Sequence, residues 1–131
     1  MGKQIRYNTT MKVKKGSEDE FQLRVANYLD KHHYVWFHTP NGGKRHIAVA
    51  TKMKAMGVKR GVPDVMIFDP VKIDGFSYVG IALELKSPTG VTSRDQIKWK
   101  AFLIKRGWYH NFLWSMAEFD ELMDRVERVS L

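Results

Sequence analysis

The stretch GVPD at residues 61–64, followed further along the chain by ELK at residues 84–86, decides how this sequence is expected to fold. Pro63 is tolerated where a strand starts, and the apolar residues after it predict a strand over residues 62–68. A second strand is predicted over residues 76–86, because its near-continuous apolar centre is typical of burial on both faces. An acid therefore opens one strand, and an acid and a lysine close another.

The spacing within ELK has a consequence for chemistry. Side chains two residues apart on a strand share a face, so Glu84 and Lys86 project together while Leu85 turns the opposite way into a core. Asp64 and Glu84 are oxygen donors of the kind that Mg²⁺ or Mn²⁺ prefers, and the carbonyl of Leu85 could add a neutral ligand. Lys86 can orient an attacking water or brace phosphoryl oxygens. These groups at strand ends are what metal-dependent cleavage of a phosphodiester bond requires.

A helix is predicted to begin at Ser17, because Ser17 and Glu20 fit a capping box. Glu18 shares one face of this helix with Val25 and Leu29. Its carboxylate is therefore expected on the inward side, where it could join a metal shell directly or through a water molecule.

The other elements complete an alternating pattern of helices and strands. Gln96 lies on the helix after the second strand, and its amide is expected to orient Lys86 or a metal-bound water. The predicted order of helix, strand, helix, two strands, helix, strand and helix favours an α/β fold, a mixed central sheet with helices on both faces. The elements not yet named are a strand over residues 34–38, a helix over 44–56 ended by Gly57, a hairpin-like connection over 69–75, a helix capped by Thr92 or Ser93 and ended by Gly107, a strand over 109–114, and a helix capped by Ser115 with Glu118 in a second capping box and an apolar stripe of Phe119, Leu122, Met123 and Val126.

Composition limits the classes of protein that this chain can represent. Its 131 residues suit one domain, predicted over residues 17–131 after a basic arm over residues 1–16. The net charge of +8 favours a polyanionic partner, most simply nucleic acid. The absence of cysteine excludes disulfides and thiolate zinc sites. No signal peptide or apolar run long enough to span a membrane is recognised, so a cytoplasmic protein is expected and no membrane partner.

Basic and polar residues around the predicted second helix are candidates for contact with DNA, since helix N-termini receive phosphates well. Ordinary loop, capping and solvated roles remain the alternatives for each of them. Trp99, Trp108 and Trp114 are interpreted as core or dimer-interface residues, with base stacking as the alternative. The predicted DNA-contacting residues are His38, Asn41, Lys44, Arg45, Lys59 and Arg60.

The joint pattern resembles the VRR-NUC (virus-type replication-repair nuclease) family of the PD-(D/E)XK nuclease superfamily, in particular its stand-alone, phage-type members. The resemblance is carried by residues 61–64, 84–86, Gly90, Gln96, 38–43 and 54–57. It implies a restriction-endonuclease-like core, a divalent cation (Mg²⁺ or Mn²⁺) and cleavage of DNA. It also suggests a homodimer that cuts four-way (Holliday) junctions.

The resemblance implies roles for individual residues. Asp64, Glu84 and Lys86 match the catalytic core of the family, and Gln96 matches its downstream glutamine. Glu18 matches the acid of the first helix, although Asp19 and Glu20 are adjacent alternatives. Two other functions stay open at this point: a restriction-type endonuclease that recognises a sequence, and a non-catalytic DNA-binding protein that kept the fold.

Overall fold

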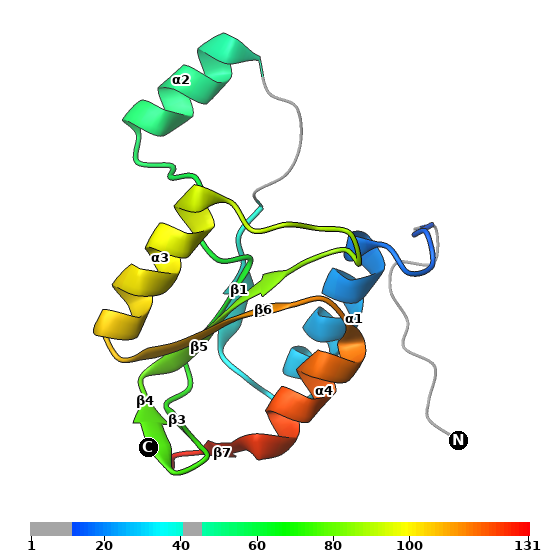
Figure 1. Ribbon diagram of the computed structural model, residues 1–131, viewed down its shortest axis with the longest axis vertical. Helices are drawn as coiled ribbons and strands as arrows, with labels where there is room; N and C mark the ends of the chain where they lie inside the picture. Colours follow the sequence, from blue (N-terminus) through cyan, green and yellow to red (C-terminus); the bar gives the residue numbers. More distant parts are fainter. Residues whose placement is uncertain (1–11, 41–45) are drawn as a thin grey trace.

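The computed structural model describes residues 12–40 and 46–131, which form four helices and seven strands. Within these ranges, no helix is long and apolar enough to cross a membrane. The helices are α1 (Glu18–Lys31), α2 (Ile47–Ala55), α3 (Arg94–Lys105) and α4 (Met116–Arg125), and the strands are β1 (Trp36–His38), β2 (Val65–Ile67), β3 (Val71–Ile73), β4 (Phe76–Tyr78), β5 (Gly80–Leu85), β6 (Trp108–Leu113) and β7 (Val126–Arg128) (Figure 1).

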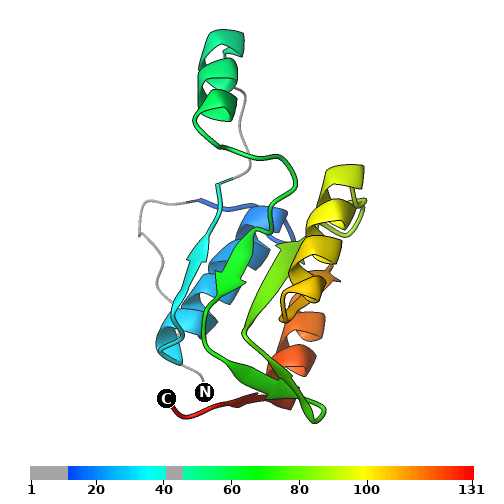
Figure 2. The same ribbon diagram turned by 90° about the vertical axis from the view of Figure 1, so that its left-hand side faces the viewer.

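The main sheet has four strands in the order β1-β2-β5-β6. The first two pairings are antiparallel, whereas β5 and β6 are parallel and are joined through α3, so the sheet is mixed. Figures 1 and 2 show α3 on one face of this sheet and α1 with α4 on the other. The prediction of an α/β fold with a mixed central sheet flanked by helices on both faces is confirmed.

The prediction of one strand over residues 76–86 is wrong, because β4 and β5 belong to different sheets. The chain changes sheets at Val79, which is half exposed. At the next position a Cβ on Gly80 would lie 2.4 Å from the carbonyl oxygen of Ile67 and 2.5 Å from the ring of Trp108. Only glycine lets β5 begin this close to its neighbours.

The small sheet, in the order β4-β3-β7, was not predicted. The segment 69–75, predicted to be only a connection, contains β3. Its actual turn is Asp74-Gly75, where both residues have positive φ values of 51° and 86°, as a two-residue hairpin turn requires. Val126 was predicted on the apolar stripe of the last helix, but α4 ends at Arg125 and Val126 pairs with Ile73 in β7.

The hydrophobic core lies between the main sheet and the pair of helices α1 and α4. From α1 it takes Phe21, Val25 and Leu29, spaced four residues apart. Glu18, one turn before this stripe, is exposed rather than turned fully inward. The other buried members of the core are Val65, Ile67, Val71, Ile73, Ile81, Leu83, Leu85, Leu113, Phe119, Leu122 and Met123.

The serine residues cap the helices as predicted, but the predicted capping boxes at α1 and α4 are incomplete. The hydroxyl of Ser17 accepts the N–H of Glu20 at 3.2 Å, but the carboxylate of Glu20 accepts from Gly16 instead of completing the capping box. Ser115 and Glu118 behave in the same way at α4. A complete capping box forms at α3, between Ser93 and Gln96, so Ser93 is the cap and Thr92 is not.

The helix α2 contributes no buried residue. Figure 1 shows it beyond the end of the main sheet at which α1 and α3 begin. It ends before Gly57, as predicted, and Gly57 has a φ of +105°. The predicted start of this helix, at residues 44–45, lies outside the described residues. The same holds for residues 1–11 of the predicted N-terminal arm.

Candidate active site

Asp64 lies directly before β2, at the end of the sheet where β5 finishes. Because Val65 pairs with Leu83, Asp64 is level with Glu84 on the neighbouring strand. The Oδ2 atom of Asp64 accepts a hydrogen bond from the N–H of Leu85 at 2.8 Å. Its backbone carbonyl accepts the N–H of Thr39 at 2.8 Å. Asp64 is therefore fixed between the ends of β1 and β5.

The loop before Asp64 packs against the start of α3. Gly61 has a φ of +80°, and a Cβ at this position would lie 2.5 Å from the backbone carbonyl carbon of Asp95 and 2.7 Å from the backbone nitrogen of Gln96. A side chain there would need both a rare backbone conformation and a shift of backbone atoms. The glycine of the GVPD motif thus sets the distance between Asp64 and the helix that carries Gln96.

The side chains at the end of β5 alternate as predicted. Leu85 is 1% exposed and belongs to the core on the side of α1 and α4. Glu84 and Lys86 project from the opposite face, where they are 0% and 9% exposed. Charged side chains are seldom buried to this degree unless they are paired or have a function.

Glu84 is a buried carboxyl group whose two oxygens have no hydrogen-bond partner among the described residues. Burial raises the pKa of Glu84 to about 8, and the negative charge of Asp64 adds to the rise, while Lys86 partly opposes it. At neutral pH without a cation, Glu84 is therefore mostly protonated. A positive charge placed beside both carboxyl groups would restore its ionised form.

Lys86 is held by two acceptors. Its Nζ donates to Oε1 of Gln96 at 2.6 Å and to the carbonyl of Val91 at 2.9 Å. Oε1 of Gln96 also accepts the N–H of Ser93 at 2.9 Å, which fixes the amide at the start of α3. The predicted proximity of Gln96 and Lys86 is thus present, and the capping box of α3 is what positions the glutamine.

Glu18 reaches the same region from the start of α1. Partial desolvation raises the pKa of Glu18, the charge of Asp64 raises it further, and Lys86 opposes the rise. These interactions place the carboxyl group of Glu18 within electrostatic reach of both side chains. Acids from three separate segments therefore converge at one end of the sheet.

The sequence predicts a site for a divalent cation among these carboxyl groups. Within residues 12–40 and 46–131, no three His, Cys, Asp or Glu side chains lie close enough together to form a ready-made metal site. The fit of a divalent cation is supported by the two unpartnered oxygens of Glu84 beside a second carboxylate. The proposed ligands, Asp64, Glu84, Glu18 and the carbonyl of Leu85, stay a prediction.

Three of the predicted DNA-contacting residues lie in the described part of the chain. His38 is exposed on β1, and its Nδ1 lies 2.9 Å from the carbonyl oxygen of Asp64. Lys59 and Arg60 are exposed on the loop between α2 and β2 that leads to Asp64. Contact of these residues with DNA stays a prediction. Asn41, Lys44 and Arg45 lie outside the described residues.

Two features of the site were not predicted. The carbonyl of Val91 holds Lys86, although backbone acceptors leave no mark in a sequence. The indole of Trp114 donates to the carbonyl of Gly90 at 2.9 Å and so ties the end of β6 to the turn after Lys86. The pairing of Trp114 with Gly90 links two positions that only the parallel register of β5 and β6 brings together.

Comparison with known proteins bears on the class of this site. The VRR-NUC domain profile matches residues 16–114. A solved structure described as a VRR_NUC domain protein is similar, with a TM-score of 0.64 and 25% sequence identity over 82% of this chain and 85% of that chain. A search of curated proteins finds no match. Fold and comparison together define an α/β domain of nuclease type, which indicates interaction with DNA. The chain belongs to the VRR-NUC domain family.

Proposed function

We propose that this protein is a divalent-metal-dependent endonuclease that hydrolyses phosphodiester bonds in branched DNA, four-way junctions in particular. The observation that supports the proposal most strongly is the buried, unpartnered carboxyl group of Glu84 beside Asp64. A protein that only bound DNA would gain nothing from burying an acid where phosphate must approach. A basic chain with a net charge of +8 attracts the substrate.

Asp64 and Glu84 would hold Mg²⁺ or Mn²⁺, with the carbonyl of Leu85 and, directly or through water, Glu18 as further ligands. When bound, the cation would supply the positive charge that makes a bound water acidic and neutralises charge on the phosphate. The hydrogen bond from the N–H of Leu85 orients the carboxylate of Asp64. Glu84, whose pKa is raised to about 8, must give up its proton before it can act as a ligand.

Lys86 has a separate task in this proposal. An ammonium group has three N–H donors, and Gln96 and Val91 accept two of them. The third donor remains available to orient the attacking water or to stabilise charge on a phosphoryl oxygen. Because the other two bonds fix the ammonium group, this donor is held in place before the substrate arrives.

A homodimer is part of the proposal, since a two-fold assembly presents two active sites to paired strands of a junction. Phe37 and Phe68 are 52% and 43% exposed and contact each other with ring centroids 5.5 Å apart. They form an apolar surface that a second copy of the chain could cover. Sedimentation velocity at micromolar concentration measures whether the protein is a dimer. A monomer both with and without junction DNA would contradict the proposed homodimer.

Cleavage assays test the proposed function directly. Purified protein is incubated with Mg²⁺ or Mn²⁺ and matched linear, flap, splayed-arm and four-way substrates, beside Glu84→Gln and Asp64→Asn variants of nearly unchanged shape. We expect cutting that favours the four-way substrate and that both variants abolish. Sequence-dependent cutting of linear duplex would indicate a restriction-type enzyme instead. Binding without cutting under either metal would indicate a non-catalytic DNA-binding protein.

A further inference from the structure

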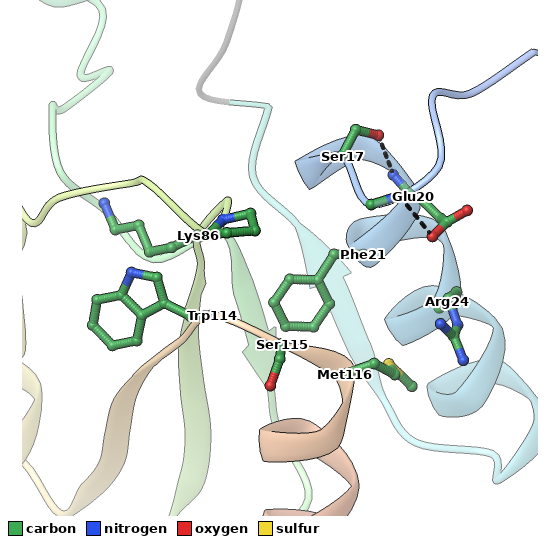
Figure 3. Close-up of a pocket in the computed structure, with 10 residues that line it drawn as sticks. Ser17, Glu20, Phe21, Arg24, Lys86, Trp114, Ser115 and Met116 are labelled. Atoms are coloured by element: carbon green, nitrogen blue, oxygen red, sulfur yellow. Dashed lines mark hydrogen bonds between the residues drawn. The ribbon is translucent and has the colours of Figure 1, made fainter.

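Trp114, the residue between β6 and α4, lies on the same face of the main sheet as Lys86. It follows Phe112 by two residues, and Phe112 pairs with Glu84, so its side chain continues the row on the α3 face. Figure 3 shows the side chains of Lys86 and Trp114 turned away from Phe21 and α1. The indole therefore belongs to the surroundings of Lys86 and not to the core between the sheet and α1.

A tight turn follows Lys86 and packs back against it. The N–H of Gly90 donates to the carbonyl of Ser87 at 2.9 Å and closes a four-residue turn. Serine at the first position, Pro88 at the second and glycine at the fourth are all favoured in turns of this kind. A Cβ on Gly90 would lie 3.3 Å from the Cβ of Lys86, so the turn touches the stem of the lysine.

The residue after this turn supplies one of the two acceptors that hold the lysine. The carbonyl of Val91 accepts Nζ of Lys86 at 2.9 Å, and Oε1 of Gln96 accepts it at 2.6 Å. Gln96 is fixed by the capping box of α3. The side chain of Val91, in contrast, is 81% exposed and has little packing of its own. The position of the Val91 carbonyl must therefore come from its neighbours in the chain.

Trp114 fixes the peptide group that precedes Val91. Its indole N–H donates to the carbonyl of Gly90 at 2.9 Å. The carbonyl of Gly90 and the nitrogen of Val91 belong to one planar peptide group, so this bond fixes the orientation of the whole plane. Only the φ and ψ rotations of Val91 then separate the fixed plane from the carbonyl that holds Lys86.

Trp114 is itself held at the start of α4. Its backbone N–H donates to Oε1 of Glu118 at 2.8 Å, and the hydroxyl of Ser115 donates to the same oxygen at 3.3 Å. The preceding residue, Leu113, accepts the backbone N–H of Lys86 at 2.8 Å. The backbone of Trp114 is thus fixed between a helix and the main sheet, and the only donor of its side chain is used on the turn.

We propose that Trp114 is a positioning residue for Lys86, because its indole N–H holds the turn that presents the carbonyl of Val91 to the ammonium group. The proposal rests on the nuclease function proposed above, in which the third N–H of Lys86 acts on the attacking water or on a phosphoryl oxygen. With Gln96 as the only acceptor, the ammonium group could rotate about one hydrogen bond. The second acceptor sets the direction of the third donor.

Lysine side-chain NMR on the full chain tests the proposal without DNA or metal. The ¹⁵N relaxation of the Lys86 ammonium group, assigned by its loss in Lys86→Arg, reports how firmly Nζ is held. We expect restricted motion in the unaltered protein and clearly faster motion in Trp114→Phe, which keeps a ring but has no N–H. Free motion in the unaltered protein would overturn the proposal without any variant, and unchanged motion in a folded Trp114→Phe would do the same.

Cleavage of the four-way substrate gives the functional readout. We expect Trp114→Phe to lower kcat by about tenfold and to change KM by less than about twofold, because the displaced donor acts after the substrate has bound. A higher KM at unchanged kcat would show that Trp114 contacts DNA instead, and it would contradict a positioning role.

Trp36→Phe serves as the matched control. It also removes an indole N–H that is hydrogen-bonded, since Trp36 donates to Oδ1 of Asp30 at 2.8 Å, but Trp36 lies on β1 at the opposite edge of the main sheet. Neither the motion of the Lys86 ammonium group nor kcat should change in this variant.

Failure of this proposal and failure of the proposed function give different results. If Trp114 does not position Lys86, the unaltered protein and Trp114→Phe cut junctions equally well and show the same motion of the ammonium group. If the protein is not a nuclease, the folded, unaltered chain cuts no substrate at all.

Discussion

Glu84 is a residue whose burial destabilises the fold and is explained by the proposed function rather than by packing. Its carboxyl group is fully buried and neither of its oxygens is hydrogen-bonded within the described chain. A leucine would serve the core better if packing were the only demand. The sequence could predict that Glu84 shares a face with Lys86, but not that its oxygens would lack partners, since that depends on every neighbouring side chain.

The raised pKa of Glu84 predicts how the stability of the metal-free protein depends on pH. A carboxyl group whose pKa is higher in the folded state stabilises the fold when protonated, and this contribution is lost as the pH rises. We expect the free energy of unfolding to fall between pH 4.5 and about 8. Denaturant titrations at a series of pH values measure this slope.

Glu84→Gln is the matched variant, because it cannot ionise and should flatten the slope. Saturating Mg²⁺ should reduce the slope of the unaltered protein, since the cation favours the ionised form of Glu84. Equal slopes for the two proteins without metal would contradict the raised pKa.

Substitution of Gln96 should lower the cleavage rate although Gln96 does not contact the reacting atoms. Its amide oxygen accepts a hydrogen bond from Lys86 and so positions the ammonium group. We expect Gln96→Leu to lower kcat by about 10- to 100-fold, the range found when partners of reactive groups are removed. Gln96→Glu keeps an oxygen for Lys86 and for Ser93 and should retain most of the activity. Single-turnover cleavage measures the effect, and equal losses in both variants would argue against a positioning role.

At the scale of elements, the approach of the loop before β2 to α3 decides where Asp64 and Gln96 meet. A sequence reveals that GVPD contains a glycine, but the reason for the glycine appears only in the contact with Asp95. The contact between Gly61 and the start of α3 therefore also fixes the position of Asp64, three residues further on, relative to Gln96.

Gly61→Ala tests this arrangement against Gly75→Ala. Both glycines have similar positive φ values, +80° and +86°, but a Cβ at Gly75 meets nothing within 4 Å. We expect Gly75→Ala to cost about 1 kcal/mol of unfolding free energy through backbone strain alone, and Gly61→Ala to cost clearly more. Only Gly61→Ala should also lower cleavage. Denaturant unfolding measures both losses of unfolding free energy. Equal losses for the two variants would mean that the contact between Gly61 and α3 does not contribute to stability.

The small sheet shows where prediction from sequence stops at this scale. Its three strands have three residues each, too few for alternation to be recognised. The partner of β3 is β7, at the other end of the chain, so no local pattern announces the pairing. In the main sheet, by contrast, β5 and β6 are each six residues long. The sequence predicted a strand at both places, although it ran β5 together with β4.

At the scale of the whole molecule, the layers of the fold could be predicted from the sequence, but the surface features between them could not. The sequence predicted the mixed sheet with helices on both faces, because the order of its helices and strands leaves few ways to pack them. It did not predict the cleft of about 200 Å³ between the start of α1, the start of α4 and the turn after β5, because these three segments are distant in the chain. It also did not predict that α2 would bury none of its apolar residues, since its pattern is that of an ordinary helix.

The basic loop before β2 predicts a salt effect on binding. If Arg60 contacts a phosphate, Arg60→Ala should weaken binding of all DNA substrates and lower the slope of log Kd against log salt by about one unit. Lys72→Ala is the control, because Lys72 is exposed on β3 in the other sheet. Fluorescence anisotropy without a cleaving metal measures both slopes, and equal slopes would place Arg60 outside the interface.

The central claim is that Asp64 and Glu84 hold a divalent cation together, and Mn²⁺ in crystals of the protein tests it most directly. The account predicts an anomalous difference peak between the two carboxyl groups, and loss of that peak in Glu84→Gln. A peak that persists in Glu84→Gln, or ordered carboxyl groups with no peak at saturating Mn²⁺, would contradict it.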